Sequence, residues 1–370
     1  MKSTGAADGF IPGLPLGRMF FSEAARPIIE SVIPADSYAA AFIGYGSDVL
    51  GYDSERSVDH NWGPRFQLFL SEETHAARNA ALDAELKKRL PGVFHGYAVG
   101  FSDPDPLDGG TQVPLLSEAG PANHLVEITT IRDYFHRYLG LDVKDGIGLL
   151  DWLTFPEQRL LELTSGDVFH DPPGELTRLR KALSYYPTDI WLYKMACQWQ
   201  KLFQQEAFVG RCAEVGDTVG MKIVAARLTR DIMRLCFLME RRYAPYEKWL
   251  GSAFARLACS GAALPRIMGA LEGREYRPIE QNLAALYGML GEMHNALGVT
   301  DPLDTSPRHF FHRPYMVIRA DRFSNALLGA IEASEVRGIS IRIGAIDQFA
   351  DSTDFIENVG MYRKSLRLYE

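Results

Sequence analysis

The chain has 370 residues, of which 46% are apolar, 11% aromatic and 23% charged, so its composition is that of a globular protein rather than a disordered one. Its 47 acidic and 39 basic residues give a formal charge of −8, which provides no overall attraction for long nucleic acids. No apolar run reaches the roughly 18 residues of a membrane span, and prolines and glycines interrupt the N-terminus where a signal peptide needs an apolar core. The four cysteines include no C-x-x-C pair, so we expect a cytoplasmic protein without a disulfide framework.

The first 150 residues alternate between helical and strand patterns. Apolar residues at helical spacing predict a helix over 21–33, and an apolar run over 38–43 predicts a buried strand that stops at a glycine turn. Further strands are predicted over 66–70, 93–101 and 125–131, with a helix over 71–90 and a long loop over 102–123. This alternation predicts an α/β (α+β) domain with a mixed sheet over residues 1–150.

From about residue 151 the pattern becomes mainly helical. Helices are predicted over 156–164, 175–185, 190–205, 219–243, 248–257 and 278–297, with prolines in several of the turns. We therefore expect a mainly α-helical domain over 151–300. Residues 301–370 form a C-terminal extension, which is either a third unit or a segment packed on the other two.

The segment over 44–63 has the pattern that predicts chemistry. Gly46 and Ser47 follow the predicted strand, and a glycine there allows a phosphate to approach backbone amides and a hydroxyl closely. Asp59 and Asn61 are two residues apart, so on a strand their side chains share one face. Oxygen ligands beside a phosphate-binding turn favour Mg²⁺ or Mn²⁺ held against a nucleoside triphosphate. The alternative is that Asp59 and Asn61 only shape a turn before the next strand.

This pattern resembles the nucleotidyltransferase signature of the DNA polymerase beta superfamily, in which a Gly-Ser is followed after a spacer by Asp-x-Asp or Asp-x-Glu. A closer resemblance, to a bacterial family of unknown function grouped with nucleotidyltransferase-like proteins, rests on residues 46–53, 59–65, 186–193, 208–211, 234–241, 243–249 and 346–352. The resemblance implies a nucleotidyltransferase domain followed by a helical domain, as in aminoglycoside nucleotidyltransferases. It also implies transfer of a nucleoside monophosphate from a nucleoside triphosphate to a hydroxyl of a small molecule or protein.

The same resemblance implies roles for individual residues. Gly46 and Ser47 are expected to hold the β- and γ-phosphates, and Asp59, Asn61 and Glu127 to hold the metal, with Glu127 as the third acid on a later strand. Asn61 stands where the superfamily has its second motif acid, and a neutral amide binds Mg²⁺ more weakly than a carboxylate. A catalytically impaired nucleotide-binding module or partner protein is therefore the alternative.

Cations for the triphosphate are expected from Arg65 and from the helix over 219–243. Arg227, Arg230 and Arg234 lie on one face of that helix, and Lys248 follows it closely; the alternative for all of them is a solvated surface.

A general base is expected from the helical domain, because the aminoglycoside nucleotidyltransferases use a carboxylate there. Glu206 and Asp217 are the candidates, with solvated loop acids or helix caps as the alternative.

Overall fold

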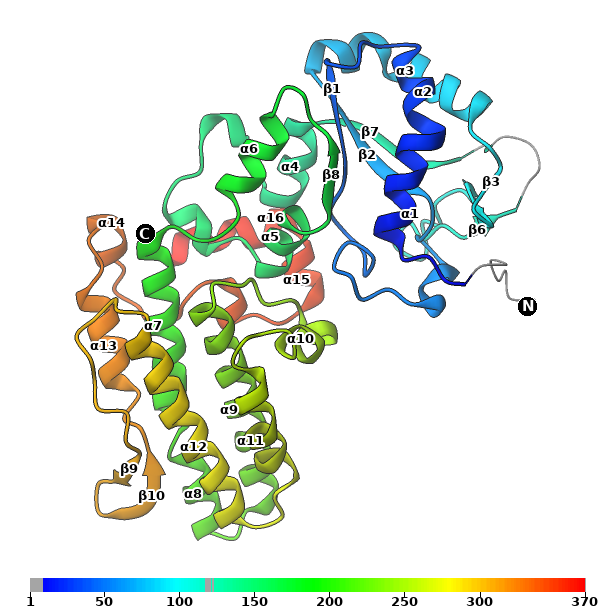
Figure 1. The fold of residues 1–370 in the computed structure, drawn as a ribbon. Helices are drawn as coiled ribbons and strands as arrows, with labels where there is room; N and C mark the ends of the chain where they lie inside the picture. Colours follow the sequence, from blue (N-terminus) through cyan, green and yellow to red (C-terminus); the bar gives the residue numbers. More distant parts are fainter. Residues whose placement is uncertain (1–8, 117–120, 122, 370) are drawn as a thin grey trace. The chain divides into compact units, whose positions relative to one another are not determined.

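The structure is a computed structural model that describes residues 9–116, 121 and 123–369 (Figure 1). It divides into two compact units. Unit 1 comprises residues up to 146 together with 159–184, and unit 2 comprises 147–158 and the residues from 185 onward. Residues 159–184 were predicted to lie in the helical domain, but they belong to unit 1 because one of its strands comes from this segment.

Unit 1 is built on a four-stranded mixed sheet with the order β7-β2-β1-β8. The strands are β1 (Tyr38–Phe42), β2 (Arg65–Leu70), β7 (Leu125–Thr130) and β8 (Asp167–His170). β1 is antiparallel to both β2 and β8, whereas β7 is parallel to β2. The end of β1, the start of β2 and the start of β7 therefore lie at the same end of the sheet.

The predicted strand over 93–101 is wrong as a member of this sheet. Its residues form β3 (Val93–Phe94) and β4 (Tyr97–Ala98), which pair with each other, and β5 (Gly100–Phe101), which pairs with β6 (Pro114–Leu115). His95 and Gly96 both have positive φ, which turns the chain back on itself after β3. The predicted loop over 102–123 includes residues 117–120 and 122, which lie outside the described residues.

The helices of unit 1 cover the sheet. The predicted helix over 21–33 begins earlier than expected, as α1 (Gly13–Met19), the π-helical η1 (Phe20–Ala25) and α2 (Arg26–Glu30). α3 (Glu72–Arg89) begins at Ser71, whose side chain accepts a hydrogen bond from the Thr74 amide. The remaining elements are η2 (Glu55–Asp59), α4 (Ile131–Leu139), η3 (Val143–Asp145), α5 (Glu157–Thr164), which begins in unit 2, and α6 (Glu175–Ala182).

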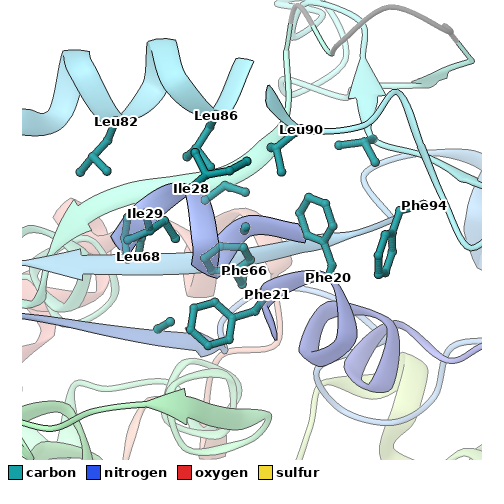
Figure 2. Packing of buried hydrophobic residues seen from close by; sticks show 14 of the residues in the cluster. Phe20, Phe21, Ile28, Ile29, Phe66, Leu68, Leu82, Leu86, Leu90 and Phe94 are labelled. Atoms are coloured by element: carbon teal, nitrogen blue, oxygen red, sulfur yellow. The ribbon is translucent and has the colours of Figure 1, made fainter. Parts of the chain in front are cut away.

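One hydrophobic core fixes the sheet in unit 1. Figure 2 shows Leu82 and Leu86 of α3 and Phe20 of η1 around Phe66 and Leu68 of β2. These five side chains are fully buried, and each such residue contributes roughly 1.5–3 kcal/mol of hydrophobic stabilisation. Phe66 and Leu68 are two residues apart, so they share one face of β2 and leave Arg65 and Gln67 on the other face.

Unit 2 is mainly helical. Its longer helices are α7 (Thr188–Gln205), α8 (Phe208–Glu214), α9 (Thr218–Met239), α10 (Glu247–Phe254), α11 (Ser260–Glu272) and α12 (Tyr276–Ala296). Residues beyond 300 form the hairpin of β9 (Arg308–Phe310) and β10 (Arg313–Val317), then α13 (Asp321–Gly329), which packs on α7. The following elements are α14 (Ser334–Arg337), η5 (Ile346–Gln348), α15 (Thr353–Glu357), α16 (Val359–Tyr362) and η6 (Arg363–Leu368). The last of these, η6, contacts η4 (Leu150–Leu153), which lies much earlier in the sequence.

The C-terminal extension therefore belongs to unit 2 rather than forming a third unit. Among the helices of the described chain, none combines the length and the apolar character that crossing a membrane requires.

Candidate functional site

The loop that follows β1 is shaped by two glycines. Gly44 has φ +92° and Gly46 has φ +135°, a region that favours glycine. A Cβ atom at Gly44 would lie 2.1 Å from the Tyr134 hydroxyl, and one at Gly46 would lie 2.1 Å from Oδ1 of Asp48. The protein's own side chains therefore fill the space beside both glycines. This corrects the prediction that an approaching phosphate is the reason for glycine at position 46.

Two tyrosines of α4 hold this loop by its main chain. The Tyr134 hydroxyl donates to the Ile43 carbonyl over 3.1 Å, and the Tyr138 hydroxyl accepts from the Tyr45 amide over 3.1 Å. Burial raises the pKa of both hydroxyls above the ordinary tyrosine value, so both remain protonated near neutral pH. The loop is thus fixed at its first and third residues, Ile43 and Tyr45.

A buried ion pair lies beneath the loop. Asp48 is 2% exposed, and its carboxylate accepts from Nη2 of Arg65 at 2.8 Å and from Nε at 3.2 Å. Nη2 of Arg65 also donates to the Tyr45 carbonyl over 2.7 Å, and the guanidinium lies 4.5 Å from the centre of the Phe42 ring. Burial alone would lower the pKa of Arg65, but the charge of Asp48 raises it above its ordinary value. Arg65 is thus a charged member of the site, and its charge is balanced by Asp48.

The next two residues of the loop leave donors unused. Within the described part of the chain, neither the amides of Gly46 and Ser47 nor the Ser47 hydroxyl makes a hydrogen bond. Both residues are partly exposed, and the Ser47 carbonyl accepts from the Tyr52 amide over 2.8 Å. Adjacent free amides and a hydroxyl are the donors that an anionic oxygen requires.

Asp59 and Asn61 lie before β2 and outside any strand, so the prediction that they share a strand face is wrong. Asp59 ends η2, its side chain is 66% exposed, and its carboxylate lies 2.9 Å from Nδ1 of the adjacent His60. Asn61 has φ +49°, and its Oδ1 accepts from the Gln112 amide over 2.8 Å while its own amide donates to the Gln112 carbonyl. Asn61 therefore joins the segment before β2 to the loop that contains Gln112, which agrees with the alternative that it shapes a turn.

Glu127 lies on β7, opposite Gln67 of β2 in the parallel register. The Gln67 side chain accepts from the Ile43 amide over 3.0 Å, so this part of the sheet leads directly to the glycine loop. The Glu127 carboxylate forms an ion pair with Arg137 of α4. The Arg137 guanidinium therefore already contacts the carboxylate that was predicted to bind a metal ion.

The residues predicted to hold Mg²⁺ or Mn²⁺ do not fit a metal centre as they stand. Asn61 uses its amide oxygen on the backbone, whereas Asp59 and Glu127 each have a basic partner. Moreover, the described residues contain no group of three or more His, Cys, Asp or Glu side chains that could hold an ion. We therefore derive no metal-dependent step.

The arginine face predicted on α9 is largely neutralised by acids of unit 2. Arg230 pairs with Glu247 at 2.7 Å, and Arg234, which is 8% exposed, pairs with the same carboxylate at 3.3 Å. Arg227 is exposed on this helix, and the Lys248 amine lies 5.1 Å from the centre of the Trp249 ring. Sharing one carboxylate between two arginines favours a structural role for that part of the face.

Neither predicted general base has the geometry of one. Glu206 is buried, and its carboxylate accepts from the amides of Ile318 at 2.9 Å and Ala320 at 3.4 Å, which connects the C-terminal end of α7 to the segment that follows β10. Burial raises the pKa of Glu206 to about 7. Asp217 is exposed, and it caps α9 by accepting from the Gly220 amide over 2.7 Å. Both residues therefore support the backbone.

The sequence analysis missed Asp48, Tyr134, Arg137 and Tyr138. Tyr134, Arg137 and Tyr138 are three and four residues apart, so one face of α4 turns all three toward the sheet. That spacing was the available signal. Asp48 gives no comparable signal, because its partner is 17 residues away in sequence.

The comparisons with known proteins locate one family match. A domain of unknown function, DUF4037, matches residues 152–250, which is less than a third of the chain. No curated protein matches the chain. A solved structure that resembles it is the nucleotidyltransferase-like protein from Exiguobacterium sibiricum 255-15, with 12% identity, 83% of this chain and 88% of that chain covered, and a TM-score of 0.30. At that TM-score the likeness decides neither the fold nor the function.

Proposed function

We propose that unit 1 binds a nucleoside triphosphate at the loop after β1. The amides of Gly46 and Ser47 and the Ser47 hydroxyl would receive phosphate oxygens, because these groups lack partners within the described residues and lie on partly exposed residues. This observation carries the proposal. The resemblance of residues 44–63 to the nucleotidyltransferase signature supports the choice of a nucleotide over other phosphates, and the formal charge of −8 speaks against long nucleic acids.

A second candidate is transfer of a nucleoside monophosphate to a hydroxyl of a small molecule or protein, with Mg²⁺ or Mn²⁺. One observation favours it: the strand register brings the loop after β1, the segment before β2 and the start of β7 to one end of the sheet. The engaged state of Asp59, Asn61 and Glu127 weighs against it. We therefore propose a nucleotide-binding module with impaired catalysis ahead of an enzyme.

Calorimetry with ATP, GTP, CTP and UTP tests the binding proposal. We expect at least one nucleotide to bind, and Ser47→Ala to weaken that binding roughly tenfold, since a hydrogen bond to a charged group contributes about 1.5–3 kcal/mol. Ser22→Ala removes an exposed hydroxyl that bonds the Met19 carbonyl, so it is the matched control and should bind like the wild type. Absence of binding by all four nucleotides to the folded protein would refute the proposal.

Labelling with α-³²P nucleotides separates the two candidates. Asn61→Asp restores the motif acid and keeps an oxygen that can accept from the Gln112 amide, so the loop geometry should persist. Aspartate also tolerates positive φ better than most residues. If the wild type labels an acceptor, the protein is an enzyme; labelling by Asn61→Asp alone identifies the natural chain as a binder.

A further inference from the structure

Glu127 was predicted to bind a metal ion, but the cation beside it is Arg137 of the same chain. We propose that Arg137 takes the place of a divalent ion at Glu127, so that this protein binds nucleoside triphosphate without a metal. This inference rests on the proposed nucleotide binding at Gly46 and Ser47. It explains why the acid aligned with the superfamily's third metal ligand is paired with a guanidinium in this chain.

The position of Arg137 follows from the chain geometry. β7 ends at Thr130, whose hydroxyl accepts from the Asp133 amide over 3.0 Å and starts α4 at once. Because no loop intervenes, the second turn of α4 returns to the strand that precedes it. Arg137 therefore meets Glu127, and its guanidinium lies 5.1 Å from the centre of the Tyr134 ring. Burial would lower the pKa of Arg137, but the charge of Glu127 raises it above its ordinary value.

The same helix is attached to the phosphate-binding loop. Tyr134 bonds the Ile43 carbonyl and Tyr138 bonds the Tyr45 amide, immediately before Gly46 and Ser47. Arg137 lies between these two tyrosines in the sequence. The helix that carries the cation thus also fixes the loop that offers the free amides, and the two parts of the proposed site keep a constant separation.

The charge balance of this sheet face opposes a divalent ion. The carboxylates of Asp48 and Glu127 are each paired with an arginine of the chain, Arg65 and Arg137 respectively. An ion at Glu127 would lie beside the Arg137 guanidinium, and the repulsion between the two cations opposes its binding. A triphosphate instead brings negative charge, and the planar fork of arginine matches phosphate oxygens well. The Arg137 side chain is 55% exposed, so it can contact a ligand while remaining beside Glu127.

Two titrations test the inference. The first follows Mn²⁺ binding by electron paramagnetic resonance without nucleotide, and the second measures triphosphate affinity by calorimetry in EDTA and in Mg²⁺. The variant is Arg137→Gln, and the matched control is Arg132→Gln, which removes an equally exposed arginine of α4 that pairs with Asp142 and Glu72.

We expect the wild type to bind no Mn²⁺ and to bind triphosphate with the same affinity, within about twofold, in EDTA and in Mg²⁺. Arg137→Gln should lose roughly tenfold in metal-free affinity, because a charge-assisted hydrogen bond is removed. It should also acquire Mn²⁺ binding, since Glu127 is then free. Arg132→Gln should behave like the wild type in both titrations.

Three results would overturn the inference: stoichiometric Mn²⁺ binding by the wild type, triphosphate binding that is lost in EDTA, or no more Mn²⁺ binding by Arg137→Gln than by the wild type. If no triphosphate binds under any condition, the proposed function fails. The Mn²⁺ titration still decides whether Arg137 occupies the position of the cation, so the two failures are distinguishable.

Discussion

Replacing Arg65 by glutamine should destabilise unit 1 far more than the loss of an ordinary surface ion pair. The change leaves the Asp48 carboxylate, 2% exposed, without its cation. An uncompensated buried charge costs about 3–5 kcal/mol. The Val49 amide continues to donate to Asp48 over 3.0 Å, and the Arg65 side chain is itself 13% exposed, so we expect a cost of about 3 kcal/mol.

Hydrogen–deuterium exchange of peptides from β1 and β2 measures this cost, because it reports the opening free energy of the affected strands without requiring both units to unfold together. Arg18→Gln is the matched control. Arg18 forms an ion pair with Asp167 in the same unit, but the two side chains are 51% and 41% exposed, so its removal should cost about 0–1 kcal/mol.

A double variant isolates the cause. Adding Asp48→Asn to Arg65→Gln removes the unpaired carboxylate charge, so the double variant should be more stable than Arg65→Gln alone. Equal exchange rates in Arg65→Gln and Arg18→Gln would refute the reasoning. The reasoning also fails if the double variant is destabilised by the sum of the free energies lost in Arg65→Gln and in Asp48→Asn measured separately.

The remaining predictions concern the loop and unit 2. Gly44→Ala should destabilise β1 by ~2 kcal/mol, because its Cβ meets the Tyr134 hydroxyl at positive φ, and Tyr134→Phe should recover part of this in exchange measurements. Native Glu206 keeps its proton between pH 4.5 and about 7 whereas the unfolded chain loses it, so the urea midpoint of Glu206→Gln should rise relative to the wild type across that window; an unchanged difference would contradict this. Asp217→Ala should lower the free energy of urea unfolding by ~1 kcal/mol and leave nucleotide binding unchanged, because Asp217 caps α9. If Asp217 were a general base, its removal would lower turnover without changing stability.

The sequence predicted the elements that have strong periodicity. α9 and α12 are long and carry regular apolar spacing, and β1, β2 and β7 are apolar or alternating runs that end at turns or caps. α3 is more polar, and the signal for it was Ser71 followed by the acids Glu72 and Glu73 of its first turn. β8 (Asp167–His170) was missed because it has only four residues, with a charged residue at its start and a polar one at its end. Its place in the sheet depends on pairing with β1, more than 120 residues earlier, which local pattern cannot show.

The candidate site shows the same limit at the level of side chains. The positions of Gly46 and Ser47 could be predicted from the motif, and so could the placement of Glu127 on a strand. The partners of Arg65, Glu127 and Asn61 could not, because each comes from a different segment and is selected by tertiary geometry. A motif predicts which groups are available, and the fold decides which of them are already used.

A glycine-rich loop after a strand is consistent with two opposite situations. In one, the missing Cβ atoms leave room for a ligand; in the other, they leave room for the protein. Here the space beside Gly44 and Gly46 is filled by Tyr134 and Asp48, so the glycines alone give no information about a ligand. The amides of Gly46 and Ser47 do, because they lack partners within the described residues, lie on partly exposed residues and are therefore available to an anion. Phosphate binding therefore depends on these two amides, and Ser47→Ala tests it at a partly exposed side chain whose hydroxyl makes no hydrogen bond within the described residues.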